Sequence, residues 1–358
     1  MGSYSVFFTN YTIGTGIYRE VPGVCQDFGK KIFLIGGERA LLAGKEKLVQ
    51  ALADSPLTIV QTELFGADCT YERMEELARL AEQSGAEMIF GMGGGKALDT
   101  AKGTAQKAGL PVFTFPTIAS TCAATTALSV VYRQDGNFDS FYFYEKPARH
   151  CFIDLDIIAH APWRYLRAGM GDTIGKHFEC HLAARGDKLD HSSALGREIS
   201  NMCYEPLREH GVQALADCRL AHASWELEQA VLANIVSTGL VSLMVLDDYN
   251  CAIAHSVYYG LVLLPGFEEK YLHGDVVAYG VLVQLAIDGQ TEQLGQVRAF
   301  LQELGIPVTL REMEISLNRE VLQPVLTETV NGPDMEHLPY PVSEDMVFEG
   351  MKLVEEYR

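Results

Sequence analysis

The chain has 358 residues, of which 48% are hydrophobic, and its formal net charge is −19. This length exceeds what one hydrophobic core normally holds, so it predicts two domains. Because nucleic-acid phosphates and anionic lipid surfaces attract clusters of Lys and Arg, the acidic excess argues against nucleic acid or a membrane surface as the main partner.

The cysteines and the N-terminus indicate where the protein resides. None of the eight cysteines forms a Cys-x-x-Cys pair, and a chain of this size does not need disulfides for stability. Residues 1–13 lack a basic region followed by an apolar core, and no apolar run reaches the length of about 18 residues that spans a bilayer. The sequence therefore predicts a cytoplasmic protein without a membrane anchor.

Between residue 30 and about residue 156, short apolar runs that end in glycine or a turn alternate with longer segments of helical spacing. Three of the runs are Lys31–Ile35, Glu87–Phe90 and Pro111–Phe115. Continuous apolar runs of this length are typical of strands that are buried on both faces of a parallel sheet. The alternation predicts a βα pattern, and hence an α/β fold with a parallel sheet.

Beyond Pro162 the spacing of the apolar residues changes. They recur at intervals of three and four, for example in residues 192–209 and 225–246, and this spacing predicts helices. Pro162 interrupts the earlier pattern just before a new helical stretch. We therefore expect a dinucleotide-binding α/β domain over residues 1–161 and an all-helical domain over residues 162–358.

The segment Gly91–Lys102 follows a predicted strand and opens a predicted helix, and it contains Gly93-Gly94-Gly95-Lys96. In such a turn the backbone N–H groups approach a phosphate closely, the helix N-terminus adds partial positive charge, and Lys96 adds a full charge. The segment lacks the third glycine of the common dinucleotide fingerprint, and Ala97 stands where a P-loop needs Ser or Thr. A tight turn that needs positive φ is the structural alternative. Three consecutive glycines followed by lysine favour a pyrophosphate-binding turn.

Several segments, in this order along the chain, resemble the glycerol dehydrogenases of the iron-containing alcohol dehydrogenase superfamily. They are residues 91–102, 115–121, 126–132, 168–172, 254–255 and 271–274. The resemblance implies a parallel α/β dinucleotide-binding domain followed by a helical domain, a fold also found in dehydroquinate synthase. It further implies an active site between the domains, an NAD(P) cofactor and a homo-oligomer. By matching position, the residues implied to hold the cofactor are Gly37, Gly94, Gly95, Lys96, Asp99, Thr117, Ser120, Thr126, Leu128 and Tyr132.

Asp172, His255 and His273 match the three residues with which this family holds one divalent ion. A carboxylate and two imidazoles can bind zinc or ferrous iron and leave a position open for a substrate oxygen. Taken singly, each residue has a structural alternative. Asp172 could be a helix N-cap, His255 a buried core histidine, and His273 a turn residue. Their joint occurrence in matching motifs favours a catalytic metal site, and the sequence does not distinguish zinc from iron.

A second histidine pair, His177 and His181, lies four residues apart on a predicted helix, as in the metalloprotease motif. In that motif the general base directly follows the first histidine. Glu179 lies two positions on instead, about 200° around the helix. We therefore interpret the pair as packing and surface residues and not as the site of a hydrolase.

Together these features predict a metal-dependent NAD(P) oxidoreductase that transfers hydride between nicotinamide and a small hydroxy compound. A lyase similar to dehydroquinate synthase is disfavoured, because the chain has no evident cluster of basic residues for a phosphorylated substrate. A non-catalytic nucleotide-binding protein would have no reason to retain both the glycine-rich turn and the three ligands.

The end of the first predicted strand bears on the choice of cofactor. Glycerol dehydrogenases commonly carry an aspartate there, which binds the adenosine ribose and repels a 2′-phosphate. Here Gly37 occupies the matching position, with Arg39 close by, and Glu38 is a second candidate for the acid. The absence of the aspartate predicts that NADPH is accepted at least as well as NADH.

Three residues of the expected pocket bear on the substrate. Cys122 stands where glycerol dehydrogenases have a polyol-contacting aspartate, and Tyr258 stands where they have a histidine. Lys176 lies four residues after Asp172, on the same predicted helix face. The loss of an anion and the gain of a cation are similar to the hydroxycarboxylate dehydrogenase branch, so we expect a small 2-oxo acid whose carboxylate is held by Lys176. Three alternatives remain open. Lys176 could form an ion pair with Asp172 or Glu179, and Cys122 could have a purely apolar role. The substrate could also be a polyol.

Overall fold

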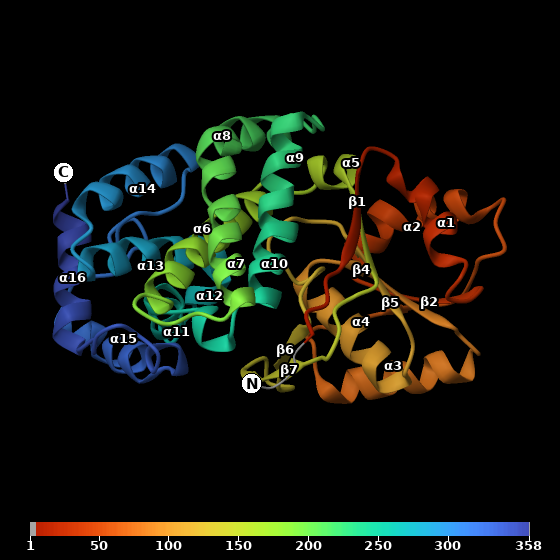
Figure 1. The fold of residues 1–358 in the computed structure, drawn as a ribbon, viewed down its shortest axis with the longest axis horizontal. Helices are drawn as coiled ribbons and strands as arrows, with labels where there is room; N and C mark the ends of the chain where they lie inside the picture. Colours follow the sequence, from red (N-terminus) through yellow and green to blue (C-terminus); the bar gives the residue numbers. More distant parts are fainter. Residues whose placement is uncertain (1–4, 358) are drawn as a thin grey trace.

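The computed structural model describes residues 5–357, which form an α/β part followed by a helical part (Figure 1). The strands are β1 Asn10–Gly14, β2 Lys31–Gly36, β3 Thr58–Leu64, β4 Met88–Gly93, β5 Val112–Pro116, β6 Leu128–Tyr132, β7 Phe138–Phe143 and β8 His150–Asp154. Six of them form one sheet in the order β1-β8-β5-β4-β2-β3, and all of its strand pairs are parallel. β6 and β7 form an antiparallel pair.

Helices cover both faces of the six-stranded sheet. They are α1 Val21–Cys25, α2 Glu38–Leu52, α3 Tyr71–Gln83, α4 Gly95–Ala108 and α5 Leu155–Ala159. In β2, Leu34 packs in one cluster with Leu48 of α2, whereas its neighbour Phe33 packs in another cluster with Leu77 of α3. Successive strand residues point to opposite faces, so a continuous apolar run needs a layer of helices on each side.

The parallel α/β architecture predicted for this part is confirmed, and the three predicted strands correspond to β2, β4 and β5. β4 continues to Gly93, two residues beyond the glycine at which the apolar run ends. β1 and the β6–β7 pair are not among the predicted strands. β1 joins the sheet only through its contact with β8, and this pairing of distant segments has no local signal.

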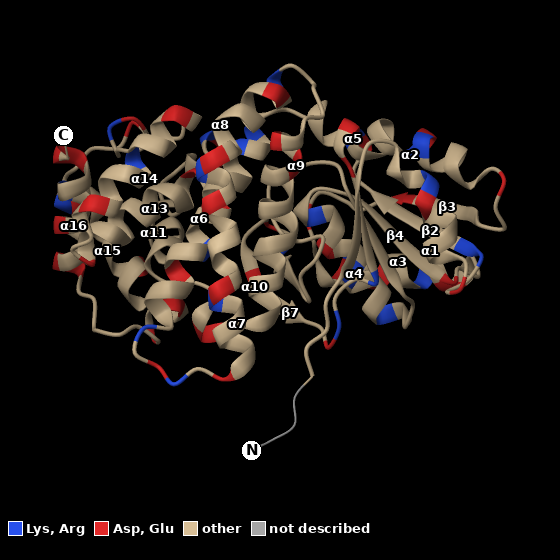
Figure 2. Ribbon diagram, turned by 45° about the horizontal axis from the view of Figure 1, so that its top comes forward, with Lys and Arg blue, Asp and Glu red and all other residues tan. Residues whose placement is uncertain are grey.

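The helical part contains α6 Arg164–Ala183, α7 His191–Ile199, α8 Glu205–Arg219, α9 Trp225–Leu232, α10 Thr238–Met244, α11 Ile253–Leu261, α12 Phe267–Lys270, α13 His273–Ile287, α14 Thr291–Leu304, α15 Arg319–Asn331 and α16 Glu344–Glu356. Between residues 162 and 357 the structure has no strand, so the predicted all-helical character is confirmed. α13 is its central helix, since every residue from Gly274 to Leu285 is buried. Acidic residues lie on outer helices such as α8 and α16 (Figure 2).

The segment Trp225–Met244, part of the predicted helix over residues 225–246, is long and apolar enough to cross a membrane by length and composition, so the expectation that no apolar run reaches this length is corrected. In the structure it runs through α9, the π-helical turn Ala233–Ser237 and α10. Its side chains Leu227 and Val231 are completely buried, as in the core helix of a folded domain. Burial in the core of the helical part accounts for the hydrophobicity of this segment.

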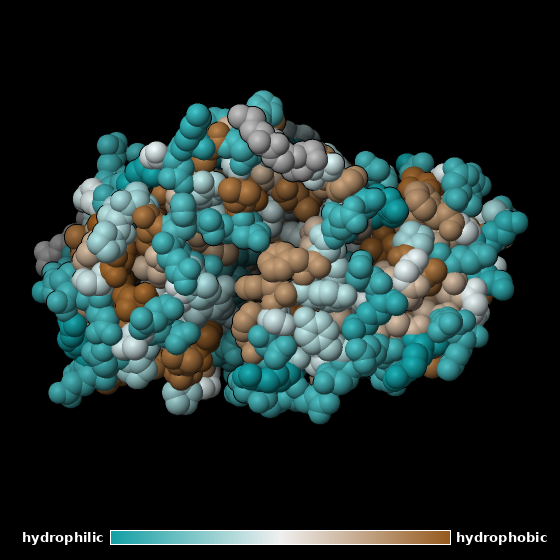
Figure 3. All heavy atoms as spheres, turned by 60° about the horizontal axis from the view of Figure 1, so that its bottom comes forward, coloured by the Kyte–Doolittle hydropathy of each residue, from teal (hydrophilic) through white to brown (hydrophobic). Residues whose placement is uncertain are grey.

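The two parts are in contact through the core. One hydrophobic cluster combines Met170 of α6 and Val277 of α13 with Ile153 of β8 and with Ala119, which follows β5. The domain boundary predicted after residue 161 lies in the connection between α5 and α6. Figure 3 shows a hollow between the helical part and the α/β part on one face of the molecule.

Candidate active site

Three helices bring the predicted metal ligands together: Asp172 lies on α6, His255 on α11, and His273 is the first residue of α13. One ligand atom from each residue lies within 4.8 Å of the other two. The Asp172 Oδ1 atom is 3.5 Å from His255 Nε2 and 3.3 Å from His273 Nε2. Two ligands about 2.1 Å from one ion in tetrahedral coordination are about 3.4 Å apart. The donor set and its spacing therefore fit a single divalent ion such as zinc or ferrous iron.

Two glycines allow α6 and α13 to approach closely at this point. A Cβ atom on Gly171 would lie 2.2 Å from the carbonyl oxygen of Gly274, and one on Gly274 would lie 1.8 Å from that of Ala168. Any larger residue would push the two helices apart. Because Asp172 follows Gly171 and His273 precedes Gly274, this backbone contact also sets the distance between the two ligands.

The charges at the site favour the ionised carboxylate. Burial alone would raise the pKa of Asp172, but its hydrogen bonds and charge interactions with His255 and His273 lower that pKa overall. For His255, burial alone would lower the pKa, but interactions with Cys251, Glu179 and Asp172 raise it overall. Asp172 is thus held in the charged form that a metal ligand requires.

Glu179 also belongs to this site, although the sequence analysis did not place it there. Its side chain is fully buried, and its Oε1 atom accepts the backbone N–H groups of Ala252 and His255, both at 2.8 Å. Its Oε2 atom is 2.5 Å from His255 Nδ1. One signal was present in the sequence: Glu179 lies seven residues after Asp172, which puts both carboxylates on the same face of α6.

The histidine pair of α6 lies elsewhere on the helix. His177 stacks on the ring of Tyr204 at a centroid distance of 5.4 Å, and its Nδ1 atom is 3.1 Å from the carbonyl oxygen of Ser200. The centroid of the His181 ring is 4.5 Å from that of His177. These contacts are packing contacts between half-buried rings.

Lys176 lies one helical turn after Asp172 and is buried. Its Nζ atom donates hydrogen bonds to the backbone oxygen of Asn250 at 2.6 Å and to the Oδ1 atom of Asn250 at 3.1 Å. The structure therefore shows Lys176 bonded to Asn250 and not paired with Asp172 or Glu179. Burial alone would lower the pKa of Lys176, but interactions with its neighbours, among them the carboxylates of Glu179 and Asp172, raise it overall and favour the charged form.

Cys122 and Tyr258 border the same region. Burial and, to a smaller extent, the charge of Asp172 raise the pKa of the Cys122 thiol to about 11 against the opposing effect of Lys176, so Cys122 is a neutral thiol. The Tyr258 ring lies edge-on to His273 with a centroid distance of 4.3 Å. Tyr258 thus lies beside a predicted ligand, and Cys122 is close enough to Asp172 for its charge to act on the thiol.

The glycine-rich turn joins β4 to α4 as the sequence predicted. Gly94 is the N-cap of α4, which begins at Gly95, and a Cβ atom on Gly94 would lie 2.6 Å from the Ile118 side chain. The Lys96 side chain, half exposed, pairs with Asp68, and its Nζ atom lies 4.6 Å from the centroid of the Tyr132 ring. The turn therefore presents a helix N-terminus and a lysine side by side, as an anion site requires.

Gly37 and Thr117 lie at the two strands beside this turn. The N–H group of Gly37 donates to the carbonyl oxygen of Met92 at 3.3 Å, and that of Thr117 donates to the carbonyl oxygen of Gly93 at 3.0 Å. Gly37 follows β2 and Thr117 follows β5, on either side of β4. Both residues are thus at the carboxyl edge of the parallel sheet, where nucleotides bind in open α/β folds.

Lys102, which the sequence analysis did not assign to a site, organises three of the predicted cofactor residues. Its side chain is only 2% exposed, and its Nζ atom is 2.9 Å from Asp99 Oδ1. The same atom is 3.1 Å from Thr126 Oγ1 and 2.5 Å from the carbonyl oxygen of Leu128. Asp99 in turn accepts the N–H group of Val130 at 3.0 Å. The signal was an opposite charge three residues after Asp99, which places Lys102 on the same helix face.

The loop that carries Ser120 connects the turn to the helix that carries Asp172. A Cβ atom on Gly95 would lie 3.2 Å from Thr121 Oγ1, and one on Gly169 of α6 would lie 2.0 Å from the carbonyl oxygen of Ala119. Asn234, in the π-helical turn, donates to that same Ala119 oxygen at 2.9 Å. The predicted cofactor residues and the predicted metal ligands therefore lie on adjoining elements.

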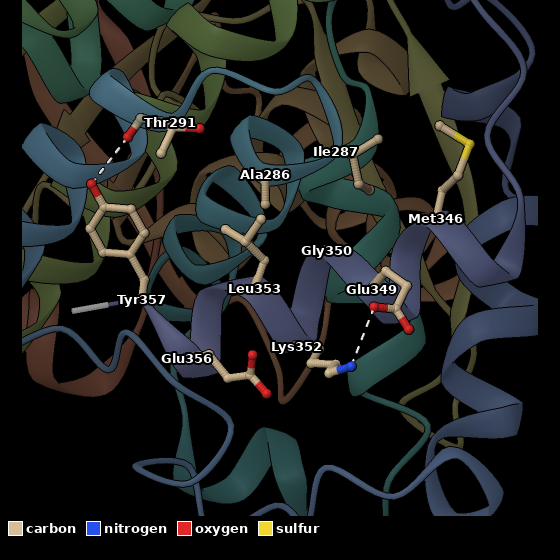
Figure 4. A pocket seen from close by; sticks show the side chains of 10 residues that line it. All are labelled: Ala286, Ile287, Thr291, Met346, Glu349, Gly350, Lys352, Leu353, Glu356 and Tyr357. Carbon is tan, nitrogen blue, oxygen red and sulfur yellow. Dashed lines mark hydrogen bonds and ion pairs between the residues drawn. The ribbon is translucent and has the colours of Figure 1, made fainter.

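A separate pocket of about 550 Å³ lies between α13, α14 and α16 (Figure 4). Tyr357 donates there to the carbonyl oxygen of Thr291 at 3.2 Å, and Lys352 lies 3.6 Å from Glu349. None of the residues predicted to hold the metal, the cofactor or the substrate lines it. This pocket is therefore not part of the candidate active site.

Known proteins are similar to this chain in sequence. Residues 9–154 match the model of the iron-containing alcohol dehydrogenase family. A glycerol dehydrogenase of Thermotoga maritima is 32% identical over 99% of this chain and 97% of its own length. Hydroxycarboxylate dehydrogenase A of Escherichia coli is 34% identical over 90% of this chain and 89% of its own length.

The fold is shared with solved structures. The crystal structure of glycerol dehydrogenase from Schizosaccharomyces pombe superposes with a TM-score of 0.90, at 26% identity, over 100% of this chain and 91% of that one. The matched residues include both the glycine-rich turn and the helices that carry the ligands, because the similarity spans both parts of the molecule. The chain therefore belongs to the iron-containing alcohol dehydrogenase family, whose members are oxidoreductases of CH–OH groups that use NAD(P) and a divalent metal.

Proposed function

We propose that the protein interconverts small 2-oxo acids and 2-hydroxy acids, and that Lys176 binds the carboxylate of the substrate. The observation that carries this proposal is a buried ammonium group one helical turn from Asp172, whose hydrogen bonds go to the two neutral oxygens of Asn250. A buried charge is normally paired with an opposite charge, because the loss of hydration is otherwise uncompensated. A substrate carboxylate would supply that charge. The similarity to hydroxycarboxylate dehydrogenase A supports this choice.

We further propose that residues 1–161 bind NAD(P) and residues 162–358 bind the metal. The N-terminus of α4, with Gly94, Gly95 and Lys96, would hold the pyrophosphate, and Lys96 would exchange Asp68 for a phosphate oxygen. The nicotinamide half would lie along Thr117, Ser120, Thr126, Leu128 and Tyr132. The buried Asp99–Lys102 pair holds the last of these segments against α4.

Asp172, His255 and His273 would hold the divalent ion, which when bound polarises the substrate oxygen and stabilises it as an alkoxide. Asp172 supplies the negative charge of the ligand set, and the two imidazoles supply neutral donors. Lys176 would fix the other end of a 2-oxo acid. A small substrate held by the ion at its oxygen and by Lys176 at its carboxylate would be oriented with its C2 atom toward the nicotinamide.

Oxidation of glycerol or a related polyol is the second candidate function. It is favoured by the similarity to glycerol dehydrogenase from Thermotoga maritima over nearly the whole chain. In that case Lys176 would remain bonded to Asn250 and would not contact the substrate. The two candidate functions therefore differ in whether the charged Lys176 side chain binds the substrate.

Steady-state rates of the metal-loaded protein with 2-oxobutyrate, 2-butanone, dihydroxyacetone and glycerol distinguish the candidates. We expect kcat/KM for 2-oxobutyrate to exceed that for 2-butanone, which lacks the carboxylate, by at least about tenfold, because the carboxylate adds a charge-assisted contact. A kcat/KM for glycerol or dihydroxyacetone equal to or above that for 2-oxobutyrate would contradict the proposal. Net oxidation of added NAD(P)H also excludes a lyase that regenerates its cofactor.

The second expectation concerns the choice between NADH and NADPH. β2 ends at Gly36, and the half-buried Gly37 begins α2 as its N-cap, followed by the exposed Glu38 and Arg39. Without a carboxylate at Gly37, we expect kcat/KM with NADPH to be at least equal to that with NADH.

Gly37→Asp provides the matched control for this expectation. Gly37 has φ −79°, and a Cβ atom there would meet the Phe65 ring at an ordinary distance of 3.5 Å, so the variant is tolerated. It should lower the NADPH to NADH ratio of kcat/KM by about tenfold or more, since a carboxylate repels the 2′-phosphate. A strong preference of the unaltered protein for NADH would refute the expectation.

We also propose that the protein is a cytoplasmic homo-oligomer. The assembly is proposed from the family resemblance. The location is supported by the cysteines, all eight of which are free.

A further inference from the structure

We propose that Glu179 is a positioning residue for the metal site, which holds the His255 ring so that its Nε2 atom faces Asp172 and His273. This inference rests on the proposed metal-dependent function and assigns a role to a carboxylate that contacts no substrate. Metal-binding histidines commonly donate their second ring N–H group to a carboxylate, which fixes both the tautomer and the ring orientation.

The two ring nitrogens of His255 face different carboxylates. Glu179 Oε2 is 2.5 Å from His255 Nδ1, while His255 Nε2 is 3.5 Å from Asp172 Oδ1. A hydrogen bond from Nδ1 to a carboxylate requires the proton to be on Nδ1. In the neutral imidazole that a metal ligand must be, the Nε2 lone pair is then free for an ion on the side of Asp172.

Glu179 also fixes the backbone of the same predicted ligand. α11 begins at Ile253, and its N-cap residue Ala252 has no side chain that could cap the helix. The first N–H groups of a helix have no partner within the helix. Glu179 Oε1 accepts two of them, from Ala252 and from His255 itself. A single carboxylate therefore holds both the main chain and the side chain of His255.

Close helix packing surrounds the Glu179 carboxylate. A Cβ atom on Gly175 would lie 2.6 Å from Val277, and 3.5 Å from Glu179 Oε2. The glycine thus lets α13 pack against α6 next to the Glu179–His255 contact. Since Asp172 and Glu179 share one face of α6, this helix supplies both a ligand and the group that orients a second ligand.

The test compares Glu179→Gln with the unaltered protein, both in the metal-free state. The amide oxygen of Gln can still accept the two N–H groups of α11, but its NH₂ group would then face His255 Nδ1. Nδ1 must accept that hydrogen bond, so the proton moves to Nε2 and blocks the metal side. We expect the affinity for Zn²⁺, measured by competition with a chelating dye, to fall about 10- to 100-fold.

A purely structural role is tested with Asp190→Asn. Asp190 caps α7 by accepting the N–H groups of Ser192 and Ser193, and it has no contact with the ligands. If Glu179 were only a helix cap, both variants would lower the melting temperature and neither would change the affinity for Zn²⁺. The proposal requires that only Glu179→Gln lose affinity, and equal Zn²⁺ affinity of this variant and the unaltered protein would overturn it.

A measurement on the unaltered, Zn²⁺-loaded protein covers the case in which Glu179→Gln does not fold. With ¹⁵N-labelled histidine we expect a slowly exchanging proton on His255 Nδ1 and one Zn²⁺ per chain. Ligand atoms of Glu179, Cys251 and His255 also lie within 4.8 Å of one another, so this group could itself hold an ion. A second Zn²⁺ bound by these three residues would overturn the proposal. A His255 Nδ1 atom without a proton would also overturn it. If the unaltered protein binds no divalent ion, the proposed function itself fails, and the two failures are thereby distinguished.

Discussion

Replacing Asp172 with alanine is expected to abolish metal binding and to lower the turnover number by about 1000-fold or more. Asp172 is the only carboxylate of the ligand set, and both imidazoles face its Oδ1 atom. A metal ion that polarises a substrate oxygen contributes several kcal/mol to the stabilisation of the transition state, and each 1.36 kcal/mol corresponds to a factor of ten in rate. Metal content by atomic emission and turnover with NAD(P)H measure the two effects.

Asp217→Asn is the matched control for Asp172→Ala. Asp217 is also a buried carboxylate of the helical part, but it accepts a hydrogen bond from Gln213 on its own helix and faces no ligand. This variant should keep its metal and its rate. If Asp172→Ala retained near-native turnover without bound metal, the assignment of the metal site would be wrong.

The second large effect is expected for Lys176→Met with 2-oxobutyrate as the substrate. Methionine keeps the apolar stem of the side chain but removes the charge. Removal of one partner of a buried charged pair costs about 2–4 kcal/mol, which corresponds to a loss of about 30- to 1000-fold in kcat/KM. We expect most of this loss in KM, because the carboxylate contact exists before the reaction begins.

A neutral substrate controls for indirect effects of Lys176→Met. The rate with 2-butanone should change little, because this ketone has no carboxylate for Lys176 to bind. Equal losses with both substrates would show that Lys176 supports the structure through Asn250 instead. An unchanged KM for 2-oxobutyrate would refute the carboxylate contact and favour polyol oxidation.

The sequence by itself determined the features that depend on neighbouring residues. The apolar runs of β2 and β4 and the turn at Gly94 have local signals, because strand burial, glycine turns and helix starts involve only a few consecutive residues. The three-residue ligand set was predicted from motifs matched in order along the chain, each of which is also local. The choice of a parallel α/β part followed by a helical part followed from the change in apolar spacing near Pro162.

Only the tertiary structure decided which side chains meet. Lys176 and Asn250 are 74 residues apart, and Glu179 and His255 are 76 residues apart. The spacing of Glu179 from Asp172 indicates a shared face of α6, but not that α11 begins against that face. Gly171 is visible in the sequence as a small residue, whereas its contact with Gly274 exists only because α6 and α13 cross there. Local conformational preferences act over one or two turns of chain, and the partners of a buried polar group are set by the packing of elements that the sequence separates.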